Sequence, residues 1–363
     1  MGTIKRKLIF WGIGTQFNNI INGIQSIDLS CSVMYVIDKD EEKNGKFVYI
    51  NNKKYVVDAP DLLNSLDPYE YSIVVSTTKY YDEVCDYISE YYCAWKGSLI
   101  SIDYIWELET DARILGVAKC PKDYRKNIDE KIPRIIHTFW FSNDKIPDLY
   151  MKCLDSWRKY CPDFEIRIWS LNDYDDNGCD YFREAINAKK WSFASDYSRA
   201  EVVYKYGGIY MDMDVEVVRN IDDLLHNDAY MSFQDLNYLE CGSGFGASKG
   251  NTIIGEIVRE YERLHFIKEN GDEDLTTCPQ RYTKIVEPYG LKKNGAFQEF
   301  SNLTIYPFEY LTAKSFGTGI TYLTENTYTV HHHNGSWVTK ENKLKWNRKY
   351  EWIRKYYSCE DKR

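Results

Sequence analysis

The ten cysteines of this 363-residue chain never form a C-x-x-C pair. Paired thiols at that spacing are the usual sign of a zinc site or a thiol redox centre, so neither kind of site is indicated. The cysteines stand singly along the chain, as free thiols do in a reducing compartment. The sequence therefore predicts a cytoplasmic protein.

Long hydrophobic runs are also missing. No stretch approaches the roughly 20 apolar residues that cross a membrane. The short apolar run after the basic N-terminus breaks at Gly12 and Gly14 without a cleavage site, and Arg6 stands where a myristoylation signal needs Ser or Thr. Basic residues are outnumbered as well: the chain has 46 Lys and Arg against 55 Asp and Glu, which gives a net charge of −9. We therefore expect no nucleic-acid partner.

The length predicts two domains, and the local patterns divide the chain into three parts. Residues 1–115 form a small Rossmann-like α/β domain, residues 130–340 a larger α/β domain, and residues 341–363 a basic amphipathic tail. The first part contains strand-like runs at 7–14, 32–37, 71–76 and 98–102, with helical patterns between them. The overall fold class predicted is α/β.

The first part has an incomplete dinucleotide-binding fingerprint. Gly12 and Gly14 follow the first strand, and Asp38 follows the second, where an acid meets a ribose hydroxyl. Phe17, however, stands in place of the third glycine. We therefore favour a Rossmann-like scaffold that does not bind NAD. Binding of a nucleotide or NAD remains the alternative.

The most informative stretch is residues 191–216. Apolar residues at helical spacing run to Gly207-Gly208, with Ser192 or Ser195 as the expected cap. A period-two pattern from Ile209 to Glu216 then predicts one strand, with Asp212 and Asp214 on the same side of it. Paired carboxylates are ligands for a hard divalent cation. On the preceding helix Asp196 and Arg199, three residues apart, share a face.

These segments resemble one family in combination. Ser195-Asp196-Tyr197-Ser198-Arg199, Tyr206-Gly207-Gly208-Ile209-Tyr210 and Asp212-Met213-Asp214 are similar to the core of the DXD-containing glycosyltransferases of family 32. The resemblance extends from about Ile132 to Trp337. It includes Ile132-Pro133-Arg134-Ile135-Ile136-His137-Thr138-Phe139-Trp140, and a closing segment His331-His332-His333-Asn334-Gly335-Ser336-Trp337. It implies a GT-A-type domain that transfers a hexose with retention of configuration.

The resemblance also implies roles for single residues. Asp212, Asp214 and His332 are the expected ligands of Mn²⁺ or Mg²⁺. The expected catalytic residues are Asp196, Arg199, Asp212 and Asp214. The expected donor-binding residues are Trp140, Asp196, Arg199, Tyr206, Asp212, Ser336 and Trp337. Trp140 is expected to stack on the nucleotide base, although a core tryptophan is the competing interpretation.

The expected partners are a nucleotide sugar, with UDP-hexose favoured over GDP-mannose, and a glycan or lipid-linked oligosaccharide acceptor. Surface or capsular polysaccharide synthesis is the implied setting. The tail is expected either to contact the inner face of a membrane or to pack on the catalytic domain. Two rival functions stay open: a redox or regulatory protein governed by residues 1–115 with a carbohydrate-binding second domain, and a scaffold for polysaccharide assembly.

Overall fold

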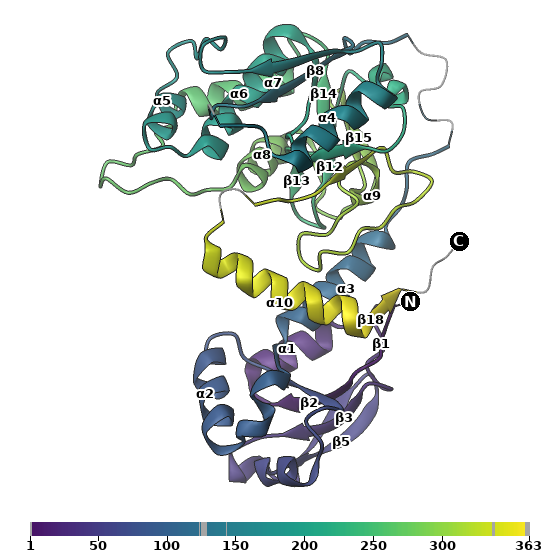
Figure 1. The fold of residues 1–363 in the computed structure, drawn as a ribbon. Helices are drawn as coiled ribbons and strands as arrows, with labels where there is room; N and C mark the ends of the chain where they lie inside the picture. Colours follow the sequence, from purple (N-terminus) through teal and green to yellow (C-terminus); the bar gives the residue numbers. More distant parts are fainter. Residues whose placement is uncertain (1, 123, 125–128, 143, 336–337, 360–363) are drawn as a thin grey trace. The chain divides into compact units, whose positions relative to one another are not determined.

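The computed structural model describes residues 2–122, 124, 129–142, 144–335 and 338–359. The chain forms two compact units. Unit 1 comprises residues 1–113, 317–320 and 339–363, and unit 2 comprises residues 114–316 and 321–338. Both units contain sheets covered by helices (Figure 1), so the predicted α/β class is confirmed. In the part of the chain described, no helix is both long and apolar enough to cross a membrane.

Unit 1 is built on a six-stranded sheet with strand order β4-β5-β3-β2-β6-β7. All neighbours are parallel except the hairpin of β4 and β5. The strands are β2 (Lys7–Trp11), β3 (Val33–Ile37), β4 (Phe47–Ile50), β5 (Lys53–Asp58), β6 (Tyr71–Val75) and β7 (Leu99–Ser101). The parallel strands have the 3-2-1-4-5 order of a Rossmann sheet.

Alternate residues of β2 explain why this sheet is covered on both faces. Leu8 and Phe10 lie in one hydrophobic cluster, and Ile9 and Trp11 lie in another. The helices of this unit are α1 (Thr15–Gly23), α2 (Tyr81–Tyr91), α3 (Asp103–Leu115), which runs on to the first residues of unit 2, and α10 (Lys340–Tyr356).

The loop that follows β2 is held in place by contacts within the protein. Gly12 has φ +89°, a conformation that favours glycine. Asp38 is buried and accepts hydrogen bonds from the Ile13 amide at 2.9 Å and from Lys43 Nζ at 2.9 Å. Phe17 is buried against Phe10, with ring centroids 5.7 Å apart. The acid predicted to meet a ribose thus braces its own loop, and the absence of NAD binding stays a prediction.

The C-terminal tail belongs to unit 1. Ile353 of α10 and Tyr357 of the following strand are part of the core of this unit. That strand, β18 (Tyr357–Cys359), pairs with β1 (Gly2–Ile4), and Trp352 donates a hydrogen bond to Ser72. The tail therefore belongs to the core of unit 1, and its expected packing on the catalytic domain stays a prediction. Its apolar face is used inside unit 1.

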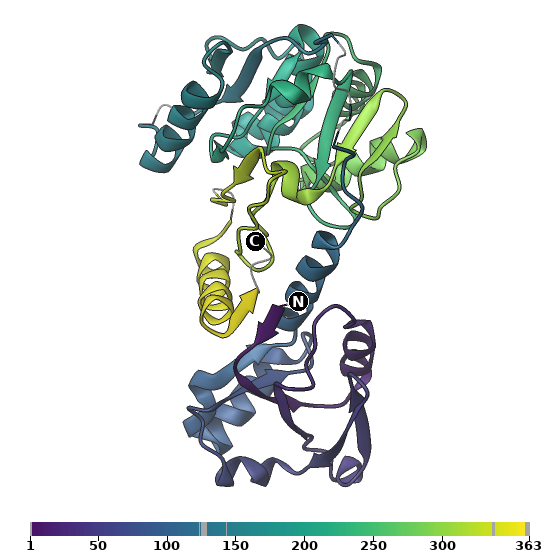
Figure 2. The ribbon, with the colours of Figure 1, turned by 90° about the vertical axis from the view of Figure 1, so that its right-hand side faces the viewer.

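Unit 2 contains an eight-stranded mixed sheet with the order β15-β16-β12-β14-β10-β8-β9, and β13 pairs with β12. Figure 2 shows this unit turned by 90°. Its strands are β8 (Ile135–Phe139), β9 (Glu165–Trp169), β10 (Gly208–Tyr210), β12 (Ala229–Phe233), β13 (Leu239–Glu240), β14 (Phe245–Ala247), β15 (Gln298–Phe300) and β16 (Leu303–Tyr306). Its helices are α4 (Asp148–Tyr160), α5 (Asp180–Asn187), α6 (Trp191–Tyr206), α7 (Thr252–Glu262), α8 (Cys278–Val286) and α9 (Phe308–Leu311).

Residues 191–216 form the predicted helix but not the predicted single strand. Helix α6 ends at Gly207, which has φ +70°, and Lys190 rather than a serine occupies its N-cap. The expected strand is split into β10 in the large sheet and β11 (Val215–Val217), which pairs with β17 (Thr329–His331). The turn between β10 and β11 carries Asp212 and Asp214. The sequence had suggested that Asp212 and Asp214 share one face of a strand, and this prediction is wrong.

Candidate functional site

The two aspartates meet through the turn and not through a strand. Asp212 follows β10, where its amide donates to the Gly242 carbonyl at 2.8 Å. Asp214 immediately precedes β11, and its Oδ2 accepts the Asn334 amide at 2.7 Å. Asp214 is buried, whereas the side chain of Asp212 is 28% exposed. One carboxylate is thus fixed in the protein and the other is open to a ligand.

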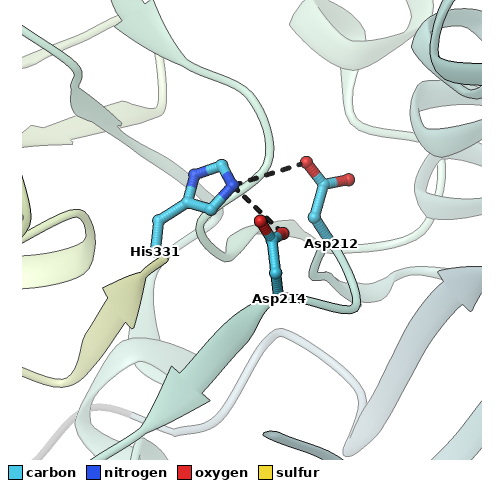
Figure 3. Close-up of side chains that lie close together, drawn as sticks. All are labelled: Asp212, Asp214 and His331. Atoms are coloured by element: carbon cyan, nitrogen blue, oxygen red, sulfur yellow. Dashed lines mark ion pairs between the residues drawn. The ribbon is translucent and has the colours of Figure 1, made fainter. Parts of the chain in front are cut away.

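His331, the last residue of β17, completes a group of three ligands (Figure 3). Its Nε2 lies 3.3 Å from Asp214 Oδ1 and 3.9 Å from Asp212 Oδ2. The three candidate ligand atoms all lie within 4.8 Å of one another. Burial lowers the pKa of His331, but Asp214 and Glu240 outweigh burial and raise it well above the usual value. In Figure 3 all three side chains point toward one common space.

His332, which the sequence analysis named as the ligand, is turned away from this space. Its Nε2 bonds Glu216 Oε2 at 3.0 Å. The reason is geometric: neighbouring residues of an extended chain project to opposite sides, and His331 takes the inner side. The metal prediction is therefore corrected from His332 to His331. His333 also turns inward, and its Nε2 donates to the Lys314 carbonyl at 2.9 Å.

Glu240 lies behind His331 and was missed by the sequence analysis. It is buried, its Oε1 accepts the amides of Cys241 and Gly242 at 3.0 and 2.8 Å, and it lies 3.5 Å from His331 Nδ1. Burial alone raises the pKa of this carboxyl, but His331 outweighs it and the pKa falls to about 2. A carboxylate on the far nitrogen is the usual means of directing the other nitrogen of a histidine toward a metal.

Arg199 and Asp196 of α6 lie beneath the aspartate pair. Arg199 Nη2 is 3.1 Å from Asp196 Oδ1 and 3.6 Å from Asp212 Oδ1. The other donors of the guanidinium bond the Ser195 carbonyl and hydroxyl and the Cys241 carbonyl, at 2.7 to 3.1 Å. Burial lowers the pKa of Arg199, but Asp212, Tyr210, Cys278 and Asp196 together outweigh burial and raise the pKa well above its usual value. Burial raises the pKa of Asp196 to about 7.

Both members of this pair are nearly inaccessible, at 6% and 5% exposed for Asp196 and Arg199. Arg199 thus directs its donors to the protein and holds Asp212 in place. Tyr210 contributes from the other side, because its hydroxyl donates to Asp212 Oδ1 at 2.5 Å. The direct contact with a donor sugar that the sequence implied for Asp196 and Arg199 stays a prediction.

Trp140 is connected to the same space through two residues. It follows β8, as predicted, is partly exposed, and packs edge-on against Tyr150 with centroids 5.7 Å apart. The Tyr150 hydroxyl accepts from Asn334 Nδ2 at 2.9 Å, and the Asn334 amide donates to Asp214. Trp140 therefore lies at the edge of the candidate site, where a base could reach it.

One expected donor-binding residue, Tyr206, is not brought to the site. Tyr206 lies at the far end of α6, with its ring stacked on Trp169 at 5.7 Å, because the helix and β10 run in opposite directions from Gly207. The structure thus does not place Tyr206 with the carboxylates. Ser336 and Trp337 lie outside the described residues.

The residues present fit a hard divalent cation. Two carboxylates and one imidazole are suitable ligands for Mn²⁺, and carboxylates also suit Mg²⁺. The backbone leaves space for the Asp212 side chain only because residue 242 is glycine: a Cβ there would lie 2.1 Å from Asp212 Oδ2. Gly242 could have been singled out from the glycine-rich run after Cys241, but Glu240 and His331 carry no comparable local signal.

The sequence around the aspartate pair is similar to that of known proteins. Residues 147–231 match the family model described as "Glycosyltransferase sugar-binding region containing DXD motif". This match includes α6 and the Asp212–Asp214 turn and covers less than half of the chain. Among solved structures, the chain is similar to the PaToxG glycosyltransferase at 18% identity, covering 44% of this chain and 70% of that one with a TM-score of 0.32. That score is too low to place any residue.

Two proteins of Schizosaccharomyces pombe are also similar. Inositol phosphoceramide mannosyltransferase 3 is 29% identical over 39% of this chain and 40% of its own length. Inositol phosphoceramide mannosyltransferase 1 is 27% identical over 41% and 47%, respectively. The chain thus spans less than half the length of either relative. Together with the family match, they confirm the predicted family: the chain carries the sugar-binding region of the DXD-containing glycosyltransferases.

Proposed function

We propose that this chain is a metal-dependent retaining hexosyltransferase. It moves a hexose from a nucleotide diphosphate sugar to a hydroxyl of a glycan or lipid-linked oligosaccharide. The anomeric carbon–oxygen bond to the diphosphate breaks, a bond to the acceptor oxygen forms, and the hydroxyl proton passes to the leaving diphosphate or to water. The observation that carries the proposal is the convergence of Asp212, Asp214 and His331.

In this proposal Asp212, Asp214 and His331 would hold Mn²⁺ or Mg²⁺, and the bound ion would supply Lewis-acid stabilisation of negative charge on the diphosphate. The protein supplies the positions of these ligands. Arg199 fixes Asp212, Glu240 fixes His331, and the Asn334 amide fixes Asp214. Trp140 stacks on the nucleotide base.

The donor expected from the sequence is a UDP-hexose. The names of the two yeast relatives make GDP-mannose the second candidate. The acceptor in this proposal is a glycan of surface or capsular polysaccharide synthesis, and the enzyme acts in the cytoplasm. The tail could contact a membrane only through the exposed lysines and arginines of α10, because the apolar Ile353 of this helix is buried inside unit 1.

The test is hydrolysis of a panel of UDP-hexoses and GDP-mannose without acceptor, in Mn²⁺, in Mg²⁺ and in EDTA. We expect hydrolysis of one donor that requires the metal. Asp214→Asn should lower it by about 10²–10³-fold, the scale for losing one preorganised electrostatic group. Glu216→Gln is the matched control, because Glu216 lies two residues further along on the outer side and bonds His332. Metal-independent hydrolysis, or full activity of Asp214→Asn, contradicts the proposal.

A further inference from the structure

A second pocket of about 560 Å³ opens in unit 2, away from the aspartate pair. This volume falls in the range of about 300–1,000 Å³ that is typical of small-molecule sites. The residues of the pocket that bear on its chemistry are Tyr306, Tyr310, Tyr328, Arg219, Asp223 and Asn326. None of them belongs to the candidate metal site.

The ladder of β11 and β17 separates the two places. His331 pairs with Val215 at the metal end of the ladder, and Thr329 pairs with Val217 at the other end. The ladder continues where the Val218 amide donates to the Tyr328 carbonyl at 2.9 Å, and the pocket begins there. Three residues of strand correspond to about 10 Å. The pocket therefore contains none of the three candidate metal ligands and begins about 10 Å along the ladder from His331.

A row of tyrosine rings forms one wall of the pocket. Tyr306 and Tyr310 have centroids 5.3 Å apart with planes tilted by 33°, and Tyr310 and Tyr328 are 6.5 Å apart with a tilt of 36°. Their hydroxyls bond protein groups: that of Tyr328 donates to Asp223 at 3.1 Å, and that of Tyr306 accepts from Asn227 at 3.2 Å. The rings are held rigidly and offer apolar edges and faces, which suit the C–H side of a sugar ring.

The polar residues of the pocket balance in charge. Arg219 and Lys122 are cationic, and Asp223 and Glu325 are anionic. The Arg219 guanidinium lies 3.7 Å from the centroid of the Tyr328 ring, and among the described residues its shielded Nε donates no hydrogen bond. This balance gives a phosphate or a polyanion no net electrostatic attraction to the pocket. Mixed donors and acceptors beside aromatic rings suit a neutral polyhydroxyl compound.

We propose that this pocket binds a hexose residue of a neutral glycan, as a second carbohydrate site apart from the donor site. Asp223 accepts from sugar hydroxyls, the Arg219 guanidinium donates to one through a terminal nitrogen, and the tyrosine rings pack on the ring carbons. Binding requires neither a metal nor a nucleotide, so it is independent of the transfer reaction proposed above.

The experiment measures binding of mannose, glucose and galactose, as methyl glycosides and as homodisaccharides, to the full chain in EDTA. Saturation-transfer-difference NMR detects the sugar. We expect at least one sugar to bind, with the disaccharide tighter than the glycoside if the end of a glycan chain occupies the pocket. Asp223→Asn should weaken binding about tenfold, since an acceptor to sugar hydroxyls loses its charge. The variant retains an oxygen for the Tyr328 hydroxyl, so the fold is preserved.

Arg219→Lys should weaken binding to a similar degree. Asp222→Asn, one residue from Asp223 but paired with Arg134, is the matched control and should bind as the parent does. Asp214→Asn should also bind normally, although it loses metal-dependent hydrolysis. The proposal is overturned if no sugar of the panel binds. It is equally overturned if Asp214→Asn abolishes binding while Asp223→Asn retains it, because the sugar then occupies the donor site.

Discussion

Two adjacent histidines allow the metal site to be tested at the resolution of a single residue. His331→Ala removes an imidazole whose Nε2 lies 3.3 and 3.9 Å from the two aspartates. His332→Ala removes an imidazole that bonds Glu216 on the other side of the ladder. The two variants have the same composition and differ by one position in the sequence, so a difference in Mn²⁺ affinity between them reports which imidazole faces the aspartates.

We expect His331→Ala to weaken Mn²⁺ binding by at least 10–100-fold. Mutating a residue that only supports a metal ligand typically lowers metal affinity by about 10–100-fold, so removing a ligand should lower the affinity at least as much. His332→Ala should leave Mn²⁺ affinity unchanged. Its loss of a partly exposed contact should lower the free energy of unfolding by only about 0–1 kcal/mol.

Isothermal titration of the metal-free chain with Mn²⁺ measures both affinities, and thermal unfolding checks that each variant is folded. Equal affinities for the two variants, or a larger loss for His332→Ala, would refute the assignment of His331. The same titration with nucleoside diphosphate present shows whether the ion and the diphosphate occupy one site.

Three further predictions follow from single contacts. Gly242→Ala should lower Mn²⁺ affinity at least about tenfold, because the added Cβ would displace the Asp212 side chain, and thermal stability should change little. Gly97→Ala is the control, because a Cβ at Gly97 meets open space. Burial lowers the pKa of His137 to about 4, so between about pH 6.5 and pH 4 this imidazole is protonated in the unfolded chain but neutral in the folded chain. The free energy of unfolding should therefore fall by up to about 3 kcal/mol as the pH falls from about 6.5 to about 4. Urea unfolding of the parent and His137→Gln at several pH values measures this, and identical pH dependence contradicts it. Trp140→Ala should weaken nucleotide diphosphate binding by about 1–3 kcal/mol, and unchanged affinity would make this residue part of the core.

The direction of the His137 effect follows from its neighbours. Its Nε2 donates to the Gly207 carbonyl at 2.9 Å, and its Nδ1 accepts from the Trp169 indole at 3.2 Å. Both nitrogens are thus satisfied in the neutral form. A second proton on Nδ1 would point at the indole N–H, so the folded chain resists protonation.

Local signals were sufficient for the elements that lead to the site. Helical spacing and the Gly207 stop predicted α6, and short apolar runs located β2, β3, β6 and β7 of unit 1 but not the β4–β5 hairpin. A buried helix face or strand face shows itself as apolar residues a few positions apart. The Asp-x-Asp motif itself was also found locally. These features depend on residues a few positions apart.

Features that depend on distant pairing were not predictable in the same way. The period-two pattern from Ile209 to Glu216 continues through the turn, but β10 pairs within the large sheet while β11 pairs with β17. The register that sets Val215 opposite His331 decides which histidine faces the aspartates. Without that register the residues themselves offer His331 and His332 equally, and the resemblance pointed to His332, which faces the other side.

The buried pair of Asp196 and Arg199 makes sense only in relation to Asp212. Two charges taken out of water lose hydration that their mutual attraction barely recovers, so such a pair is weak evidence for stability. Arg199 nevertheless contacts a second carboxylate, that of Asp212, and holds the loop beside it through the Cys241 carbonyl. Glu240 acts from the same loop on His331. We infer that the free energy spent on burying these charges fixes Asp212 and His331 before any ligand arrives. A turn such as that between β10 and β11 would otherwise let the two aspartates separate, because like charges repel.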